Sequence, residues 1–254
     1  MQAIDLRKPI DDPIFALIYG GSGTGKTHLV GTIGELGRTL VIDVDKGSKT
    51  LRTAKRVKPF LDNIIVTTFD KFQDLDHAYK VMQRNDPDEW SSVLQLSGPE
   101  AIKKPFEWIV WDSWSELQWN MMQQLRKNES LLSAGESLVF RKNLQIQHWG
   151  ALTDLNKLCV EQLRDVKSVN QAFVMLETMS KDELSGTIFG GPAIHGKLVA
   201  EFPGYFDVVA RTYTDLSGKY YATTKSKGKW PAKTLLGSGD DYLDPTAKKI
   251  FSFS

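Results

Sequence analysis

The sequence predicts an α/β protein with a mostly parallel twisted sheet, helices on both faces and an antiparallel hairpin near the C-terminus. Short apolar runs alternate with segments of helical periodicity, which is typical of parallel strands joined by helices. The run Ile14–Tyr19 ends in a glycine-rich turn and leads directly into a helical pattern. Residues 205–213 and 218–224 alternate apolar and polar residues around a turn at 215–218, which predicts the hairpin.

The length and composition are those of an ordinary globular protein. With 254 residues, 41% of them hydrophobic and 25% charged, the chain can bury a large core. We expect one domain over residues 1–254, with a tail at 1–12 and an extension at 234–254. The single cysteine, Cys159, excludes an internal disulfide, and its place in a helical pattern predicts a buried thiol. The net charge of +1 gives no overall nucleic-acid signature, so binding of that kind must rest on local patches.

The sequence shows neither a signal peptide nor a membrane span. Its first residues, MQAIDLRKPIDDP, are charged and interrupted by prolines. No apolar run approaches the roughly 20 residues that a membrane helix needs. The sequence therefore predicts no membrane partner and a cytoplasmic location.

The segment GGSGTGKT fits the spacing G-x-x-x-x-G-K-[ST]. Its glycines let the backbone adopt positive φ and approach a ligand, so that successive N–H groups form an anion cradle at a helix N-terminus. Lys26 would reach the β- and γ-phosphates of a nucleotide, and the Thr27 hydroxyl would complete a Mg²⁺ shell. An ordinary glycine turn is the alternative, but the strand before it and the helix after it favour a nucleoside triphosphate site. The residues predicted to hold the nucleotide are Gly20, Gly21, Ser22, Gly23, Thr24, Gly25, Lys26, Thr27 and His28.

Two acidic residues, Asp43 and Asp45, end the second predicted strand at 39–45. Ligands of open α/β sheets collect at the carboxyl ends of the strands, so these carboxylates should face the phosphate loop. The next segment, residues 46–58, carries six basic side chains. A solvated helix face explains most of them, and contact of one or two with a nucleotide or DNA is the alternative.

Asp112 follows another apolar strand, Phe106–Trp111. In nucleotide-binding proteins such a carboxylate holds Mg²⁺ directly or through water. A mere helix cap is the alternative role, since Ser113 and Glu116 have the spacing of a capping box. Four tryptophans lie at core-facing positions of this strand and helix, which favours the core over a nucleobase platform: Trp108, Trp111, Trp114 and Trp119.

The remaining pattern continues the alternation of strands and helices. We expect a strand at 63–68, helices at 72–84 and 149–166, and a strand at 172–176. Residues 85–105 contain proline and glycine and predict a loop.

Several polar segments bear on ligand binding. Glu177 and Thr178 end the fifth strand, where a polar side chain could sense the γ-phosphate. Residues 126–148 are polar and predict a mobile loop, with a short helix inside it as the alternative. The glycine-rich residues 179–197 predict a flexible loop that orders on binding, with a long connector as the alternative. His195, within it, has no partners at metal-like spacing and is given no metal role.

The segment 225–233 places four lysines around Trp230. Such a segment could follow a phosphate backbone with one stacking residue. A solvated hairpin tip is the alternative.

This order of phosphate loop, acidic second strand, Asp-ended strand and glycine-rich loop resembles the RecA-type ATPase core. The similarity covers residues 12 to about 233, and its specific motifs are Gly20–Thr27 and Asp112. The chain looks most similar to phage-borne RecA-like proteins of the Sak-four type, which are single-strand annealing recombinases grouped with phage nucleotide-binding AAA-domain proteins. The resemblance implies a RecA-like P-loop fold and slow hydrolysis of ATP with Mg²⁺. It also implies action on single-stranded DNA as an oligomer, in the cytoplasm of a bacterial host.

The resemblance also implies roles for individual residues. In RecA-type proteins a carboxylate just beyond the second strand activates the attacking water. The matching position is Asp45, an aspartate where RecA has glutamate, with Asp43 as the alternative; a strand-end carboxylate without a catalytic duty also remains open. The polar sensor falls on Glu177 or Thr178, and the residue that stacks on adenine falls on Arg52.

Contacts with partners follow from the same resemblance. The loops that line DNA in RecA filaments correspond to residues 126–148 and 179–197, although neither is strongly basic. Lys225 and Lys227 match, by position, the lysines that reach the γ-phosphate across a subunit interface.

Two other functions share the phosphate loop. The first is an ATPase that acts on a protein, as a replication or packaging accessory without direct DNA binding, and the modest net charge favours it. The second is a small-molecule kinase. Such kinases usually carry an arginine-rich lid, whereas residues 126–148 hold only Arg126 and Arg141, so the kinase ranks last.

Overall fold

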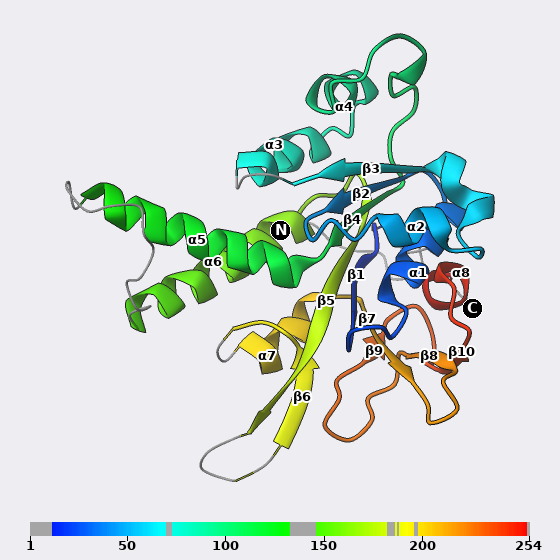
Figure 1. Ribbon diagram of the computed structural model, residues 1–254, viewed down its shortest axis with the longest axis vertical. Helices are drawn as coiled ribbons and strands as arrows, with labels where there is room; N and C mark the ends of the chain where they lie inside the picture. The colour runs from blue at the N-terminus through cyan, green and yellow to red at the C-terminus, as the bar shows by residue number, and fades with distance from the viewer. Residues whose placement is uncertain are drawn as a thin grey trace, which may run out of the picture.

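The computed structural model describes residues 12–69, 73–132, 146–181, 186, 188–195 and 198–252. Strands within these ranges form one twisted sheet in the order β10-β8-β7-β1-β5-β4-β2-β3 (Figure 1). The strands that pair in parallel are β1 (Phe15–Gly20), β2 (Thr39–Asp43), β3 (Ile64–Thr68), β4 (Trp108–Asp112), β5 (Asn170–Lys181) and β7 (Val208–Thr214).

Antiparallel strands extend the sheet at the other edge and beyond β5. The expected hairpin is present, because β8 (Tyr220–Thr223) pairs with β7. Two short strands follow: β9 (Lys233–Thr234), at the start of the segment expected to be a C-terminal extension, and β10 (Asp241–Leu243) within it. Strand β6 (Ile188–Pro192) pairs with the far half of β5. The mostly parallel α/β class with a C-terminal antiparallel hairpin is confirmed.

Helices cover both faces of the sheet (Figure 1). One face is covered by α3 (Gln73–Met82), α4 (Pro87–Val93), α5 (Trp114–Leu132), α6 (Ile146–Arg164) and α7 (Leu198–Glu201). The other face is covered by α1 (Lys26–Gly31), α2 (Lys49–Thr53) and α8 (Ala247–Phe251). Four 3-10 turns complete the connections: Thr32–Glu35, Lys58–Asn63, Gly98–Glu100 and Phe202–Tyr205.

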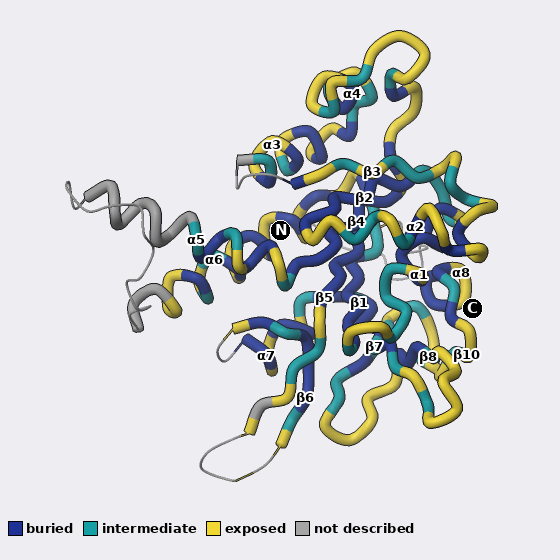
Figure 2. Tube along the Cα trace, in the orientation of Figure 1, coloured by how far each residue is buried: buried dark blue, intermediate teal, exposed yellow. Residues whose placement is uncertain are grey.

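The central strand β1 shows why the sheet needs helices on both sides. Phe15, Leu17 and Tyr19 point into the core under α5 and α6, whereas Ala16 and Ile18 point into the core under α1. All five are buried, and Figure 2 shows the same dark core through the middle of the sheet. A parallel strand buried on both faces has to be apolar along its whole length, as this one is.

The expected loop at 85–105 contains a helix. Asp86 caps α4, because its side chain accepts hydrogen bonds from the N–H groups of Asp88 and Glu89 at 2.9 and 3.0 Å. Pro87 occupies the first helical position, where its missing N–H costs nothing. The loop expectation was wrong here because proline was taken as a helix breaker, whereas Pro87 begins a helix.

Two other expected loops are also partly regular structure. Helix α5 continues to Leu132 and α6 begins at Ile146, so both ends of the expected loop 126–148 are helical, while 133–145 lie outside the described residues. Most of the described part of 179–197 belongs to the β5–β6 hairpin, in which Met179 pairs with Gly190 and Lys181 with Ile188. The flexible-loop expectation therefore fails for the paired residues.

The tryptophan expectation holds for three residues of four. Trp108, Trp111 and Trp114 are buried, but 46% of Trp119 is exposed, so its core assignment was wrong. Cys159 is buried as expected, and burial raises the pKa of its thiol to about 11.

The β5–β6 hairpin packs against Trp230, and this contact requires a glycine. A Cβ atom at Gly190 would lie 2.1 Å from a ring carbon of Trp230, and the Gly190 N–H donates to the Lys229 carbonyl at 2.9 Å. We expect Gly190→Ala to lower the free energy of unfolding by about 1–3 kcal/mol in urea denaturation, because the ring has to move. Gly204→Ala is the control, since an added Cβ there meets nothing within 4 Å. Equal stability of the two variants would contradict this contact.

Candidate functional site

The strands place the predicted site residues at one edge of the sheet. Gly20 at the end of β1 is level with Leu176 of β5 and with Thr212 of β7. Asp43 at the end of β2 is level with Asp112 of β4. The phosphate loop and the acidic strand ends therefore meet at the carboxyl edge, where open α/β sheets bind ligands.

The phosphate loop has the expected backbone. Gly25, directly before α1, has φ of 88° and Gly23 has φ of 74°, values that only glycine adopts readily. At Gly20 the requirement is space, because a Cβ there would lie 2.2 Å from Oγ1 of Thr212. The Thr212 hydroxyl is also 2.8 Å from the Thr24 hydroxyl, so β7 holds the loop in place.

Lys26 lies across this loop. Its Nζ donates to the carbonyls of Gly20 and Gly21 at 2.9 and 2.7 Å. Burial lowers the pKa of the amine, while the nearby carboxylates, Asp112 foremost, oppose that change. The ammonium is thus kept beside the cradle by two main-chain oxygens, which a phosphate oxygen could replace as partners.

A cavity of about 310 Å³ opens between this loop and the acidic strand ends. It brings together residues of the loop, the region after β2, the end of β4 with the start of α5, and β5. Its lining residues are Ser22, Gly23, Lys26, Thr27, Asp45, Asp112, Ser113, Ser115, Glu116 and Leu176.

Asp112 is a buried carboxylate of this cavity. Burial, followed by the charges of Asp45 and Asp43, raises the pKa of this carboxyl to about 7, against a partial offset from Lys26. A divalent cation would relieve the cost of burying this charge. The donor set of one carboxylate and the Thr27 hydroxyl suits Mg²⁺, which keeps several waters and binds phosphates besides one or two protein groups. Among the described residues no cluster of three His, Cys, Asp or Glu side chains offers a metal site made by protein alone.

Asp43, the last residue of β2, and Asp45, two residues further on, have different surroundings. The buried Asp43 carboxylate accepts hydrogen bonds from the N–H groups of Gly47 and Ser48, both at 3.0 Å, and so shapes the turn. Asp45 lines the cavity. Burial of its inner side raises the pKa of Asp45, and the neighbouring Asp43 adds to this effect against a hydrogen bond from Gly47.

Glu177 lies beside the phosphate loop. A Cβ built on Gly21 would be 3.4 Å from its Oε1, and its other oxygen forms an ion pair with Nε of Arg211 at 3.0 Å. Thr178, on the opposite face of β5, pairs with Gly191 and is absent from the cavity lining.

Two neighbours of the loop, Arg211 and Tyr220, lack any motif in the sequence. Arg211 lies between Glu177 and Trp230, with its guanidinium carbon 3.9 Å from the Trp230 ring centroid. Tyr220 contacts the loop at Gly25, where an added Cβ would lie 3.1 Å from its ring. The sequence signal for these residues was the alternation of apolar and polar side chains in the β7–β8 hairpin, and this alternation does not show which strand lies beside β1.

Other predicted residues lie away from the cavity. His28 and Arg52 are exposed and do not line it. Lys225 pairs with Asp240 at 3.5 Å, and Lys227 pairs with Asp241.

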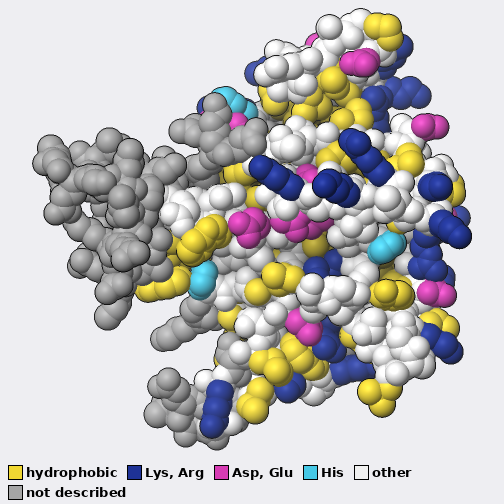
Figure 3. All heavy atoms as spheres, viewed as in Figure 1, with side chains coloured by type: hydrophobic (Ala, Val, Ile, Leu, Met, Phe, Trp, Pro, Cys, Tyr) yellow, Lys and Arg dark blue, Asp and Glu magenta, His cyan; other side chains and the backbone are white. Residues whose placement is uncertain are grey.

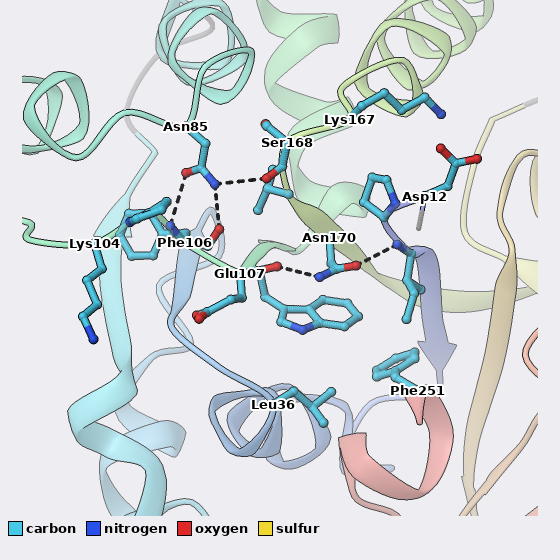
Figure 4. Close-up of a pocket in the computed structure, with 15 residues that line it drawn as sticks. Asp12, Leu36, Asn85, Lys104, Phe106, Glu107, Lys167, Ser168, Asn170 and Phe251 are labelled. Carbon is cyan, nitrogen blue, oxygen red and sulfur yellow. Dashed lines mark hydrogen bonds between the residues drawn. The ribbon is translucent and has the colours of Figure 1, made fainter. Parts of the chain in front are cut away.

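A larger cavity, of about 640 Å³, lies at the opposite edge of the sheet (Figure 4). It is lined by Ile14, Trp108 and Asn170, at or next to the amino ends of β1, β4 and β5. The Asn170 side chain is already bonded to the Ile14 N–H at 2.7 Å and the Glu107 carbonyl at 2.8 Å. The polar groups of Asn170 are thus engaged within the protein, whereas Lys26, Asp45 and Asp112 line the 310 Å³ cavity.

The raised pKa of Asp112 predicts a pH-dependent stability for the metal-free protein. Below about pH 4 the carboxyl is neutral in both states; between pH 4 and 7 the unfolded chain loses the proton first, so the folded state loses stability as pH rises. Relative to wild type, Asp112→Asn should therefore gain stability from pH 4 to pH 8, by on the order of 3 kcal/mol in urea denaturation. A difference between the two proteins that does not change with pH would contradict the burial of this charge.

Comparison with known proteins identifies the family to which this chain belongs. A solved structure described as the RadB recombinase is similar at 11% identity and a TM-score of 0.48, over 91% of this chain and 88% of that one. No curated protein matches the sequence. In the described part of the chain, no helix has the length and apolar character to cross a membrane. The family model for the AAA domain matches residues 12–235. The chain belongs to the AAA domain family.

Proposed function

We propose that this protein is a RecA-like ATPase that hydrolyses ATP with Mg²⁺ and acts as an oligomer on single-stranded DNA, in annealing or strand pairing. The observation that carries the proposal is the 310 Å³ cavity, in which Lys26 and Thr27 face Asp45 and Asp112. A phosphate cradle, a metal-binding carboxylate and a second carboxylate are the parts that in-line attack of water on a γ-phosphate needs.

The residues divide this work between them. The loop N–H groups and Lys26 would hold the phosphates, and Lys26 would leave the two carbonyls that it contacts. Thr27 and Asp112 would hold Mg²⁺, which when bound withdraws charge from the γ-phosphate. Asp45 would accept a proton from the attacking water, a role that its raised pKa favours. Glu177, next to Gly21, would sense the γ-phosphate.

Features outside the cavity support an oligomer on DNA. The β5–β6 hairpin stands out from the sheet (Figure 1), and 63% of Met179 and 51% of Ile188 are exposed on it. Lys225 and Lys227 would reach the γ-phosphate of a neighbouring subunit, and their ion pairs at the surface are worth only about 0–1 kcal/mol each. A cation supplied in trans can raise the rate of phosphoryl transfer by about 10³–10⁵.

A phosphate-release assay with and without single-stranded DNA tests the proposal. We expect DNA to stimulate hydrolysis at low salt, and the stimulation to fall as salt rises, because phosphate-backbone contacts release counterions. The proposal fails if single-stranded DNA neither binds nor stimulates at low salt.

A protein partner is the second candidate, supported by the net charge of +1. In that case hydrolysis would not depend on DNA and would rise on addition of a replication or packaging protein. The same assay distinguishes the two functions.

A further inference from the structure

Residues 46–58, here called the basic segment, concentrate charge in a protein that is almost neutral. The segment contains six basic residues and no acidic ones, whereas the whole chain has 32 basic and 31 acidic residues. It connects β2 to the start of the turn before β3 and includes α2. All six cationic side chains are exposed: Lys46, Lys49, Arg52, Lys55, Arg56 and Lys58.

The basic segment is fixed to the body of the protein along its length. Leu51, Ala54 and Val57 are buried in the core under α1. The packing on α1 is so close that a Cβ at Gly31 would lie 2.4 Å from a methyl carbon of Val57. At the far end, Arg56 pairs with Asp244 at 3.2 Å. The segment is thus a preorganised surface, and its cations point outward because its apolar residues face inward.

In the described part of the chain, five of these six cations have no ion-pair partner. Apart from Arg56, none of the basic segment's side chains forms an ion pair within the described ranges of the chain, although Lys80, Arg84, Lys225 and Lys227 elsewhere on the surface each do. Figure 3 shows Lys and Arg side chains gathered over the region of α2 and along the adjoining side of the molecule. Like charges held this close repel one another, and a polyanion lying across them would remove the repulsion.

We propose that the basic segment binds the phosphate backbone of single-stranded DNA. The proposal rests on the proposed function, which makes DNA the partner, and it assigns that contact to a surface outside the two loop regions 126–148 and 179–197. Residues 46–58 contain no aromatic side chain, so they offer charge without base stacking. Binding by this surface should therefore be independent of sequence and strongly dependent on salt.

The position of the basic segment connects DNA with the nucleotide. The segment begins at Lys46, directly after Asp45, which lines the nucleotide cavity. The carboxylate of Asp43 holds the start of the segment in place by accepting hydrogen bonds from the N–H groups of Gly47 and Ser48. DNA bound here would pass beside the carboxylate proposed to activate water. Because the two sites are adjacent, DNA bound here would change the rate of ATP hydrolysis through its effect on Asp45.

Fluorescence anisotropy with a labelled oligothymidylate, repeated across a salt series, tests the proposal. The test variant is Lys49→Gln/Lys55→Gln/Lys58→Gln. The control, Lys103→Gln/Lys104→Gln/Lys167→Gln, removes the same charge from exposed lysines around the larger cavity at the opposite edge of the sheet. We expect the slope of log K against log salt to become shallower by about 2 in the test variant, at 0.7 for each lost contact, and to keep its wild-type value in the control.

The outcomes separate this inference from the proposed function. If the wild-type protein binds DNA and both triple variants have the same slope, the inference is wrong and the proposed function stands. If the wild-type protein binds no DNA, the proposed function itself fails. Circular dichroism and binding of a fluorescent ATP analogue should match wild type in both variants. A test variant that changes only the oligomer size, with the DNA slope intact, would make the segment a subunit contact and overturn the inference.

Discussion

Lys26→Ala should reduce ATP turnover by at least about 10²-fold while leaving the fold intact. Among the described residues, Lys26 is the one cationic side chain that lines the 310 Å³ cavity, so its loss removes the positive charge that stabilises the phosphates in the transition state. Its hydrogen bonds to the carbonyls of the buried Gly20 and the half-buried Gly21 are offset by the burial that lowers the pKa of the amine, so we expect little net change in stability. Steady-state phosphate release measures the loss, and urea denaturation should show a change of less than about 1 kcal/mol.

A matched control separates this effect from a general loss of positive charge. Lys219, exposed near the turn between β7 and β8, can be replaced by alanine in the same assays, and its turnover should equal that of the wild type. If Lys26→Ala keeps turnover within about threefold of wild type, the cavity does not handle phosphate as proposed.

Arg211→Gln should lower the free energy of unfolding by about 3 kcal/mol. Only 14% of the Arg211 side chain and 22% of the Glu177 side chain are exposed, so removal of the arginine leaves a largely buried carboxylate without its partner. The variant also loses the cation–π contact with Trp230, whose ring centroid lies 3.9 Å away. Urea denaturation measures the change.

A double-mutant cycle isolates the pair. Glu177→Gln/Arg211→Gln should be less destabilised than the sum of the two single variants, because the double variant buries no unpaired charge. Lys225→Gln is the control for a surface pair, since 56% of that lysine and 67% of Asp240 are exposed, and its effect should stay below about 1 kcal/mol. Additive effects at Glu177 and Arg211 would show that the ion pair contributes nothing to stability.

Predictions from local chemistry agree best with the structure. The segment Gly20–Thr27 joins β1 to α1, as the motif spacing predicted, because its glycines allow the positive φ angles that this turn requires. Asp112 could also be placed, since an apolar strand followed by a capping box is a local pattern, and the Glu116 N–H is bonded to the Ser113 hydroxyl at 3.4 Å. Asp86 and Pro87 carried an equally local helix signal, which the proline-rich surroundings hid.

Other predictions failed because they depended on distant partners. The glycines of 179–197 indicated flexibility, yet Gly190 allows the close approach of Trp230, and a Cβ added at Gly191 would lie 3.1 Å from a methyl carbon of Val199. Trp119 had core-facing spacing, but 46% of it is exposed. A spacing specifies a face of a helix or strand, and only the packing of other segments specifies whether that face is covered.

The amino-acid sequence by itself determined the mostly parallel α/β class, the phosphate loop and the acids at the strand ends, because apolar periodicity and backbone chemistry act over a few residues. The tertiary structure decided that β5 separates β1 from β4, so that Asp112 and Lys26 line one cavity. It also decided that Arg211 of β7 pairs with Glu177 of β5. These choices depend on strand order, which is set by the burial of both sheet faces at once and has no counterpart in any single stretch of sequence.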